Sequence, residues 1–378
     1  MISAPVVAFA IIGGFLAKVT AREDTYPQLR IFQDVVQLIT GSYVDPVNVD
    51  KVMTGAMHGL ADSLDPDSAY LSADQVRQIE TNAPQPTADV GLDLTRQYYL
   101  RVIAARDGSS AAKAGLRTGD YVRIIGDTPT REMSVYEGMR RLRGAPGTKI
   151  SITVIRGSAA DPHVIELTRD VPPTTDVTGR IAAPGVGYLR VTTVGARTAE
   201  QAKARIADLV KGGASKLIVD IRRASGGSLD GGIALAKLFI GTGTLTIRET
   251  RGADKVTLTA ASGDGSVTLP TTLLIDTGTS GGAELFAASL LGNSRAESIG
   301  ERTIGRAALQ KLVRLPDGSG LWLTTTRFLT PAGTPLHEKG LEPTVAVDEP
   351  DVDFGAPAPT TDPILDKALE RLAQKKAA

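Results

Sequence analysis

The 378-residue chain has no cysteine, one tryptophan, and aromatic residues at only 4% of its positions. It can therefore form no disulfide or thiolate metal site, and it has no cysteine nucleophile. Forty-two basic residues balance forty-two acidic ones, so the basic excess that favours nucleic-acid binding is missing. The three histidines lie far apart in sequence, and we expect surface or edge positions for them, with no metal and no cofactor: His58, His163 and His337.

Charge is also absent from residues 2–17, which Lys18 and Arg22 follow. A comfortable membrane span takes about 20 residues, so a signal sequence or a marginal membrane anchor fits this segment better. Val19-Thr20-Ala21 offers small residues for cleavage. We expect residues 1–24 to direct export to the periplasm or to the outer face of the cytoplasmic membrane. A buried N-terminal helix is the alternative.

Residues 25–82 carry a helical pattern. Apolar side chains recur every three or four positions, as in Leu29, Phe32, Val36 and Ile39. Residues 43–46 interrupt the pattern, residues 49–64 resume it, and Ser72 with Gln75 predicts the start of a third helix. Such a unit either mediates dimerisation or packs on the body of the protein. A proline-containing linker follows at residues 82–88.

Residues 87–170 alternate between strand-like runs and short helical pieces. The runs cover residues 90–94, 99–103, 121–125 and 149–154, and the helical pieces begin near Ser110 and Ser134. With Ala114-Gly115-Leu116 and Gly119-Asp120, this order resembles a PDZ domain of the bacterial, circularly permuted type.

A PDZ domain binds a peptide C-terminus as an added strand and takes its carboxylate in a loop of backbone N–H groups. The resemblance implies that this loop and strand consist of Gly91, Leu92, Asp93 and Leu94. Val135, Met139 and Leu142 share one helical face and would line the side-chain pocket. The alternative for these three is ordinary core packing.

Residues 171–349 show an α/β pattern. Strand-like runs at residues 187–191 and 216–221 alternate with helical patterns at residues 199–211 and 229–240. A third apolar strand leads into the glycine-rich turn at Gly281. Residues 350–378 read as a mobile Pro/Ala-rich linker followed by a final helix that begins at Asp362-Pro363.

The whole order resembles the carboxyl-terminal processing peptidases, PDZ-containing periplasmic serine peptidases with a Ser/Lys dyad. It implies an α/β multidomain fold: a helical N-terminal unit, a PDZ domain, and a peptidase core similar to the tail-specific protease and ClpP/crotonase-like folds. Matching motifs include Tyr43-Val44-Asp45-Pro46, Leu142-Arg143-Gly144, Leu315-Pro316-Asp317-Gly318 and Lys339-Gly340-Leu341-Glu342-Pro343.

In that family the nucleophilic serine lies three residues before a glutamate, and the lysine base follows it by twenty-five residues. Here Glu284 places the two positions at Gly281 and Arg306, which are twenty-five residues apart. The resemblance also implies that Gln310 orients the base and that Gly226 and Gly227 help to form the oxyanion hole.

Neither dyad position holds a catalytic side chain. Gly281 has none, and a guanidinium stays charged where a lysine amine could lose its proton. Ser280 is an alternative nucleophile, but it has no evident base. The structural alternative for the hydroxyls of Ser280, Thr279 and Thr277 is that they cap the helix that follows. Arg306 either pairs with a nearby carboxylate or holds a peptide carboxylate.

We therefore expect an inactive homologue that binds protein C-termini through its PDZ domain, as an adaptor or regulator. It would associate with itself or with an active homologue. The alternatives are an active serine endopeptidase that uses Ser280, and a structural oligomer with a vestigial PDZ domain.

Overall fold

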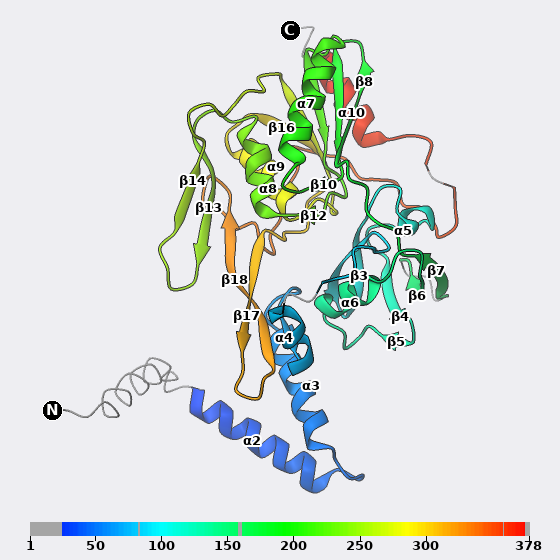
Figure 1. Ribbon diagram of the computed structural model, residues 1–378, viewed down its shortest axis with the longest axis vertical. Coiled ribbons are helices and arrows are strands. Elements are labelled where there is room, and N and C mark those ends of the chain that lie inside the picture. The colour runs from blue at the N-terminus through cyan, green and yellow to red at the C-terminus, as the bar shows by residue number, and fades with distance from the viewer. Residues whose placement is uncertain (1–24, 82–83, 158–160, 358, 375–378) are drawn as a thin grey trace, which may run out of the picture. The chain divides into compact units, whose positions relative to one another are not determined.

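The computed structural model describes residues 25–81, 84–157, 161–357 and 359–374 (Figure 1). The expected export segment, residues 1–24, lies outside them. The chain divides into two compact units, with the boundary between Gly59 and Leu60. Across the described ranges, no helix is both long enough and apolar enough to span a membrane.

Among the described residues, the first unit contains one whole helix and most of a second. Helix α2 spans Thr25–Ser42 and α3 begins at Val49 and runs to Asp62. The expected break at residues 43–46 separates them. Asn48 accepts a hydrogen bond from the Lys51 amide at 2.9 Å, which satisfies a free N–H group in the first turn of α3.

The end of the expected helical unit belongs to the second compact unit instead. Strand β1 (Ala69–Leu71) pairs antiparallel with β18 (Gly320–Leu329), and this contact across the sequence draws residues 60–81 into the larger unit. A three-residue strand is too short to show a period, so the sequence did not predict it. The predicted third helix is present as α4 (Ala73–Glu80), with a capping box between Ser72 and Gln75.

Residues 87–170 form an antiparallel sheet with two short helices, and we call this part the antiparallel module. Its strand order is β2-β3-β4-β6-β7, with β5 beside β4, so β2 is an edge strand. Four of the strands and both helices were predicted, whereas β5 and β7 were not. The elements are β2 (Leu92–Gln97), β3 (Tyr99–Ala105), α5 (Ser110–Lys113), β4 (Tyr121–Ile125), β5 (Thr128–Pro129), α6 (Val135–Leu142), β6 (Lys149–Ile155) and β7 (His163–Thr168).

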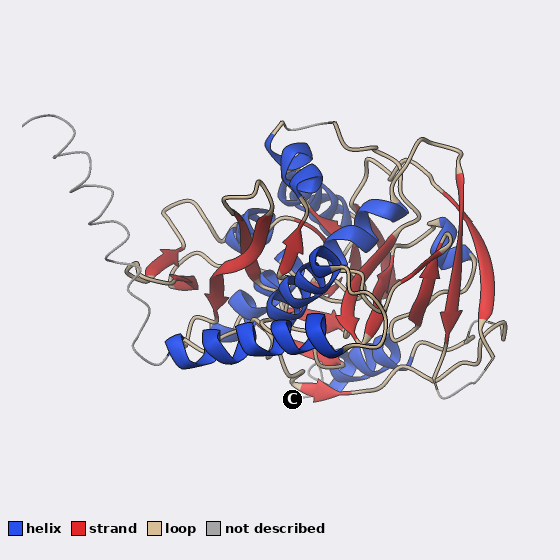
Figure 2. Cartoon of the chain, turned by 90° about the horizontal axis from the view of Figure 1, so that it is seen from below, coloured by secondary structure: helices blue, strands red, loops and turns tan. Residues whose placement is uncertain are grey.

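A second sheet forms the centre of the core. Its order is β19-β16-β15-β11-β9-β8, and every neighbouring pair is parallel except β8 with β9 (Figure 2). Its strands are β8 (Val177–Ala183), β9 (Val186–Val191), β11 (Lys216–Asp220), β15 (Thr271–Ile275), β16 (Ala296–Gly300) and β19 (Val345–Ala346). The predicted strands at 187–191 and 216–221 are thus confirmed.

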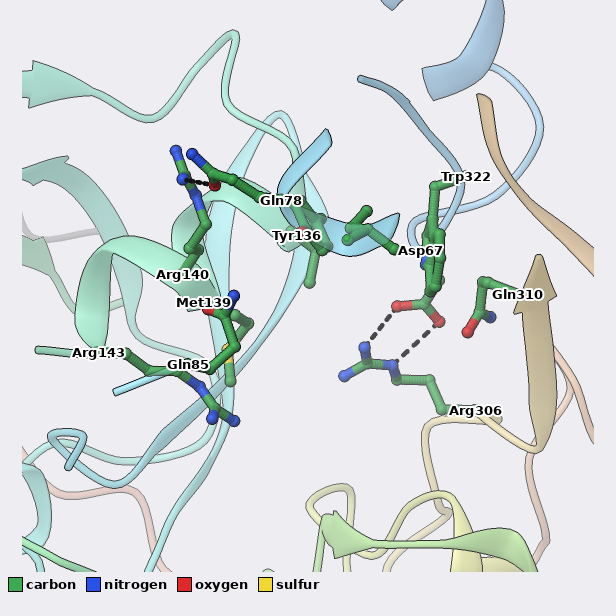
Figure 3. Close-up of a pocket in the computed structure, with 12 residues that line it drawn as sticks. Asp67, Gln78, Gln85, Tyr136, Met139, Arg140, Arg143, Arg306, Gln310 and Trp322 are labelled. Atoms are coloured by element: carbon green, nitrogen blue, oxygen red, sulfur yellow. Dashed lines mark hydrogen bonds and ion pairs between the residues drawn. The ribbon is translucent and has the colours of Figure 1, made fainter. Parts of the chain in front are cut away.

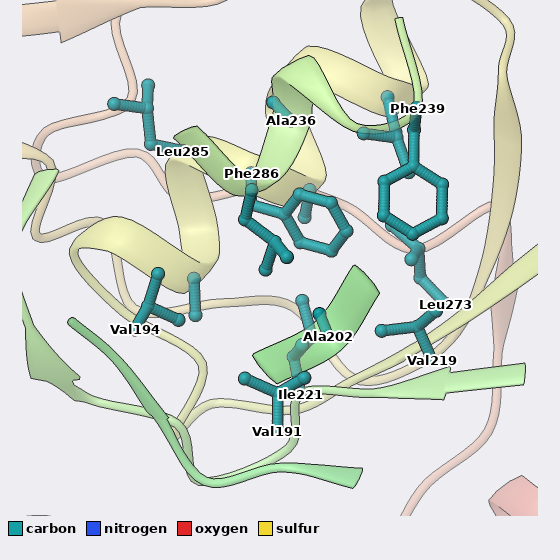
Figure 4. Close-up of a cluster of buried hydrophobic side chains, with 14 of the residues drawn as sticks. Val191, Val194, Ala202, Val219, Ile221, Ala236, Phe239, Leu273, Leu285 and Phe286 are labelled. Atoms are coloured by element: carbon teal, nitrogen blue, oxygen red, sulfur yellow. The ribbon is translucent and has the colours of Figure 1, made fainter. Parts of the chain in front are cut away.

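Helices cover both faces of this sheet because its strands alternate two apolar faces. Val219 and Leu273 pack with Phe286 in the cluster under three helices (Figure 4). Ile218 and Leu274 point the other way and pack against the last helix. The helices are α7 (Thr198–Lys211), α8 (Leu229–Lys237) and α9 (Gly282–Gly292) on the first face, and α10 (Pro363–Gln374) on the second.

A third sheet carries a long hairpin. Its order is β1-β18-β13-β14, and β17 pairs with residues 320–327 of β18 along the opposite edge of that strand. The strands of this sheet not yet given are β13 (Thr244–Thr250), β14 (Val256–Thr259) and β17 (Ala308–Arg314). Two further strands, β10 (Thr193–Val194) and β12 (Gly226–Gly227), form a separate parallel pair.

The expected mobile tail is packed at its beginning. Phe354 stacks on His163 of the antiparallel module, with ring centroids 4.2 Å apart. Arg156 donates hydrogen bonds to the carbonyl oxygens of Val352 at 3.2 Å and Asp353 at 3.4 Å. The ring and the two carbonyls explain why this part of a Pro/Ala-rich segment is held in place. Asp362 then caps α10, as predicted, by accepting from the Leu365 amide.

Candidate functional site

Two glycine-rich turns meet at the carboxyl ends of the core strands. The amide of Ser280 donates to the Ala224 carbonyl at 3.3 Å, which joins the Gly281 turn to the turn containing Gly226 and Gly227. A Cβ atom on Gly282 would lie only 2.2 Å from the Ser228 carbonyl oxygen, so no larger residue fits there without movement. The structure thus brings together the predicted nucleophile position and the predicted oxyanion turn.

Gly281 occupies a strained turn between β15 and α9. Its backbone angles are φ 59° and ψ −120°, a conformation that side-chain-bearing residues rarely adopt. A sharp strand-to-helix turn of this kind exposes a nucleophile in hydrolases. A Cβ atom built on Gly281 would meet nothing closer than the Ser225 carbonyl oxygen at 4.0 Å. The turn therefore has the geometry and the space for a nucleophile that the sequence omits.

The neighbouring hydroxyls do not cap α9, so that expectation was wrong: its N-cap is Gly281, with no side-chain hydrogen bond. Thr279 Oγ1 instead lies 3.0 Å from the Ile221 carbonyl oxygen and from Asp276, and Thr277 donates to Glu301. Ser280 is 1% exposed, and its hydroxyl forms no hydrogen bond with any described residue.

Glu284 connects the Gly281 turn to the loop that carries Arg306. It is fully buried in the first turn of α9 and accepts hydrogen bonds from the amides of Gly305 and Arg306, both at 2.8 Å, and from the Thr303 hydroxyl. Burial raises the pKa of Glu284 to about 7, although these donors counteract the rise. The glutamate that sets the register in the sequence therefore also positions the second loop.

All three nitrogen atoms of the Arg306 side chain donate hydrogen bonds to other residues. Its Nε and Nη2 atoms donate to the Asp67 carboxylate at 3.0 and 2.5 Å, and Nη1 donates to the Leu94 carbonyl at 3.0 Å (Figure 3). Burial alone would lower the pKa of Arg306, but the charge and hydrogen bonds of Asp67 outweigh it and raise the pKa above its ordinary value. The guanidinium is thus a fixed cation.

Of the two roles expected for Arg306, pairing with a nearby carboxylate is the one observed. Asp67 already supplies the two-point contact that a peptide carboxylate would make, and its charge repels a second anion. Asp67 was not predicted as a site residue. It lies 239 positions away in a turn before β1, and no local pattern relates the two residues.

Gln310 lines the same cavity as Arg306, but it does not hydrogen-bond to it. Its amide nitrogen donates to Thr324 Oγ1 at 3.2 Å across the β17–β18 hairpin. Within the described ranges, no group of three His, Asp or Glu side chains is placed to hold a metal ion.

Strand β2 of the antiparallel module contacts the turn beside Gly226 and the Arg306 side chain. The Ser225 hydroxyl, in the turn beside Gly226, hydrogen-bonds to the Asp93 carboxylate. The Leu94 carbonyl accepts from Arg306. Leu94 lies opposite Val102 of β3. The Val102 amide donates to the Asp120 carbonyl and the Val102 carbonyl accepts from the Gly119 amide, so both groups face away from β2. Leu94 and Val102 are therefore a non-hydrogen-bonded pair, and the Leu94 carbonyl faces the free edge of β2.

The other predicted peptide-binding residues surround this edge. Gly91 has a φ of 78°, and its amide donates to Asp89. Leu92 and Leu94 side chains are buried in the core of the module. Val135 and Met139 of α6 line the cavity next to Arg306, whereas Leu142 is 1% exposed and belongs to the core alone. For Leu142, ordinary packing is the correct interpretation.

Comparison with known proteins agrees with this geometry. Residues 185–347 match the model of Peptidase family S41. The carboxy-terminal-processing protease of Bartonella bacilliformis is 29% identical over 336 residues, or 87% of this chain and 77% of that protein. The carboxy-terminal processing protease CtpA of Bacillus subtilis is 29% identical over 83% of this chain and 67% of its own. The solved structure of the photosystem II D1 C-terminal processing protease superposes on this chain with a TM-score of 0.69 and 24% sequence identity. The match covers 84% of this chain and 92% of that one.

The fold and the matches define a mixed α/β protein whose core is of the S41 peptidase type. Over 87% of its length the chain is homologous to a carboxy-terminal-processing protease, as its motifs predicted.

Proposed function

We propose that this protein is a non-cutting homologue of the carboxyl-terminal processing proteases. The observation that carries the proposal is the Arg306–Asp67 pair at the position of the base, opposite a turn whose nucleophile position is Gly281. A guanidinium with a raised pKa accepts no proton from a hydroxyl, and glycine offers no hydroxyl.

Ser280 does not replace the missing serine in this proposal. Ser280 is 1% exposed, and its hydroxyl has no hydrogen bond to a described residue that could act as a base. Lys311, the nearest lysine in sequence to Arg306, is exposed and next to Gln310 in β17, so it faces the opposite side of the strand.

We further propose that the antiparallel module is a PDZ domain that binds protein or peptide C-termini, and that the protein works as an adaptor or regulator. The edge position of β2, the neighbouring helix α6 and the Gly91 loop support this function, since a C-terminal peptide adds to such an edge as a strand. The protein would regulate by associating with itself or with an active homologue. Residues 1–24 would direct its export.

A cleavage assay tests the first proposal. Purified protein is incubated with an unfolded substrate that ends in apolar residues, beside the Ser280→Ala variant. We expect no cleavage by either protein. Cleavage that disappears in Ser280→Ala would establish an active serine endopeptidase instead.

Binding measurements test the second. Fluorescent peptides with a free C-terminal carboxylate are compared with their C-terminal amides, and we expect about tenfold weaker binding of the amides. Equal binding of the two would contradict PDZ-type recognition.

A further inference from the structure

A cavity of about 500 Å³ lies between helix α6 and the Arg306 loop (Figure 3). One wall consists of Tyr136, Met139 and Arg140 of α6, and the opposite wall contains Arg306, Gln310 and Trp322. This volume falls in the range of small-ligand sites and accommodates two or three peptide side chains.

The cavity has an excess of positive charge. It is lined by Arg140, Arg143 and Arg306 but by a single carboxylate, that of Asp67. Asp67 is committed to Arg306 through the two-point pair. Among the described residues, neither Arg140 nor Arg143 has an acidic partner, and Arg143 is exposed.

Arg140 combines a neutral hydrogen-bond partner with a buried donor that has no partner. Its Nη1 atom donates to the neutral Gln78 side chain at 2.5 Å. Its Nε atom is buried and has no hydrogen-bond partner. A guanidinium presents five N–H donors, and a buried donor without an acceptor is unfavourable, so the arrangement favours a ligand that brings acceptor oxygens.

Apolar side chains from both walls also line the cavity. The rings of Tyr136 and Trp322 lie 6.0 Å apart at an interplanar angle of 42°, and Met139 adjoins them. Aromatic and thioether surfaces of this kind pack against aliphatic or aromatic side chains. The cavity therefore combines an anion-binding corner with an apolar surface.

We propose that this cavity binds an acidic side chain of a bound peptide, with Arg140 taking its carboxylate and the Tyr136–Trp322 surface taking an adjacent apolar residue. The proposal rests on the peptide-binding function proposed for the antiparallel module. Val135 and Met139 connect the two, because they line the cavity and also belong to the helix beside β2. The site thus selects C-termini that carry Asp or Glu upstream of their last residues.

A peptide scan tests this selection. Peptides of ten residues with an apolar C-terminus carry one Glu at successive upstream positions, and the reference peptide has Gln throughout. We expect one or two adjacent Glu positions to bind about tenfold more tightly than Gln, as a charge-assisted contact provides. Equal binding at every position would overturn the inference, and failure of all peptides to bind would overturn the proposed PDZ function instead.

Variants of α6 assign the effect to its residue. In Arg140→Gln the Glu preference should disappear while the Gln peptide binds as before. Arg141→Gln is the matched control, because Arg141 is adjacent on the same helix, pairs with Glu137 at 2.8 Å and does not line the cavity. It should keep the full preference.

Charge reversal provides a gain of function that misfolding cannot imitate. Arg140→Glu should prefer a Lys peptide over the Glu peptide at the selected position. Loss of the Glu preference in the Arg141→Gln control, or its persistence in Arg140→Glu, would contradict the assignment to Arg140.

Discussion

Arg306 and Asp67, 239 residues apart in sequence, form a two-point ion pair in which Nε and Nη2 meet the two carboxylate oxygens at 3.0 and 2.5 Å. The Asp67 side chain is 8% exposed and that of Arg306 is 26% exposed. The residue at the position of a catalytic base is thus a structural link between the turn before β1, the core loop and strand β2.

Removing the charge of Asp67 should destabilise the protein. In Asp67→Asn the guanidinium loses its counter-charge in a mostly buried place, and we expect a loss of about 2 kcal/mol in the free energy of unfolding, less than for a fully buried pair. Urea denaturation measures it. The double variant Asp67→Asn/Arg306→Met should recover part of the loss, and an equal or greater loss would argue against a specific pair.

Restoring the missing groups should restore some chemistry. A serine Cβ at Gly281 has open space to 4.0 Å, so we expect slow peptide hydrolysis in Gly281→Ser/Arg306→Lys and none in either single variant. Because the charge of Asp67 would keep a lysine at 306 protonated, adding Asp67→Asn should raise the rate further. Hydrolysis by Gly281→Ser alone would show that a different base serves this turn.

The bond from Arg306 to Leu94 should weaken peptide binding. A peptide added as a strand to β2 needs the Leu94 carbonyl, which Arg306 already occupies. Arg306→Lys keeps a cation near Asp67 but carries its donors on one nitrogen instead of three, so the bond to Leu94 should be lost. We expect C-terminal peptides to bind several-fold more tightly, roughly the value of one hydrogen bond. Titration calorimetry on both proteins measures the change. Weaker binding to the lysine variant would mean that Arg306 contacts the peptide directly.

Stability should decrease as the pH rises toward neutrality. Burial raises the pKa of Glu284 from its ordinary value of 4.5 to about 7, so the folded state holds this proton more tightly than the unfolded state. Its contribution is complete below pH 4.5 and is lost through pH 7, and it amounts to roughly 3 kcal/mol at most.

Glu284→Gln should flatten the pH dependence between pH 6 and 8. Asp276, whose pKa burial raises to about 6, contributes in the same direction at lower pH and remains in the variant. Urea denaturation at pH 5, 6.5 and 8 separates the two groups. An unchanged slope above pH 6 in Glu284→Gln would assign the effect to another residue.

The sequence predicted the elements that have a strong local period. Helices α2, α4, α6 and α7 and the central strands follow apolar spacing or caps such as the Ser72–Gln75 box. The register from Glu284 also pointed to two loops that lie together in the structure, because Glu284 itself binds the Arg306 amide.

Contacts between distant segments could not be predicted in the same way. Nothing near Arg306 in sequence points to Asp67, and nothing near Ser225 points to Asp93. Strand β1 becomes a strand only because β18 offers it an edge. Such contacts depend on the placement of whole elements, which no local propensity encodes.

The stack of Phe354 on His163 gives the antiparallel module a second attachment to the rest of the chain. The chain leaves the core after β19, touches the module at residues 352–354, and returns to the core sheet as α10. The module therefore contacts the core through β2 and also contacts residues 352–354. Further along the chain, the Arg222–Asp362 ion pair holds the start of α10 on the core. Loss of the β2 contacts alone would therefore leave the module attached to residues 352–354.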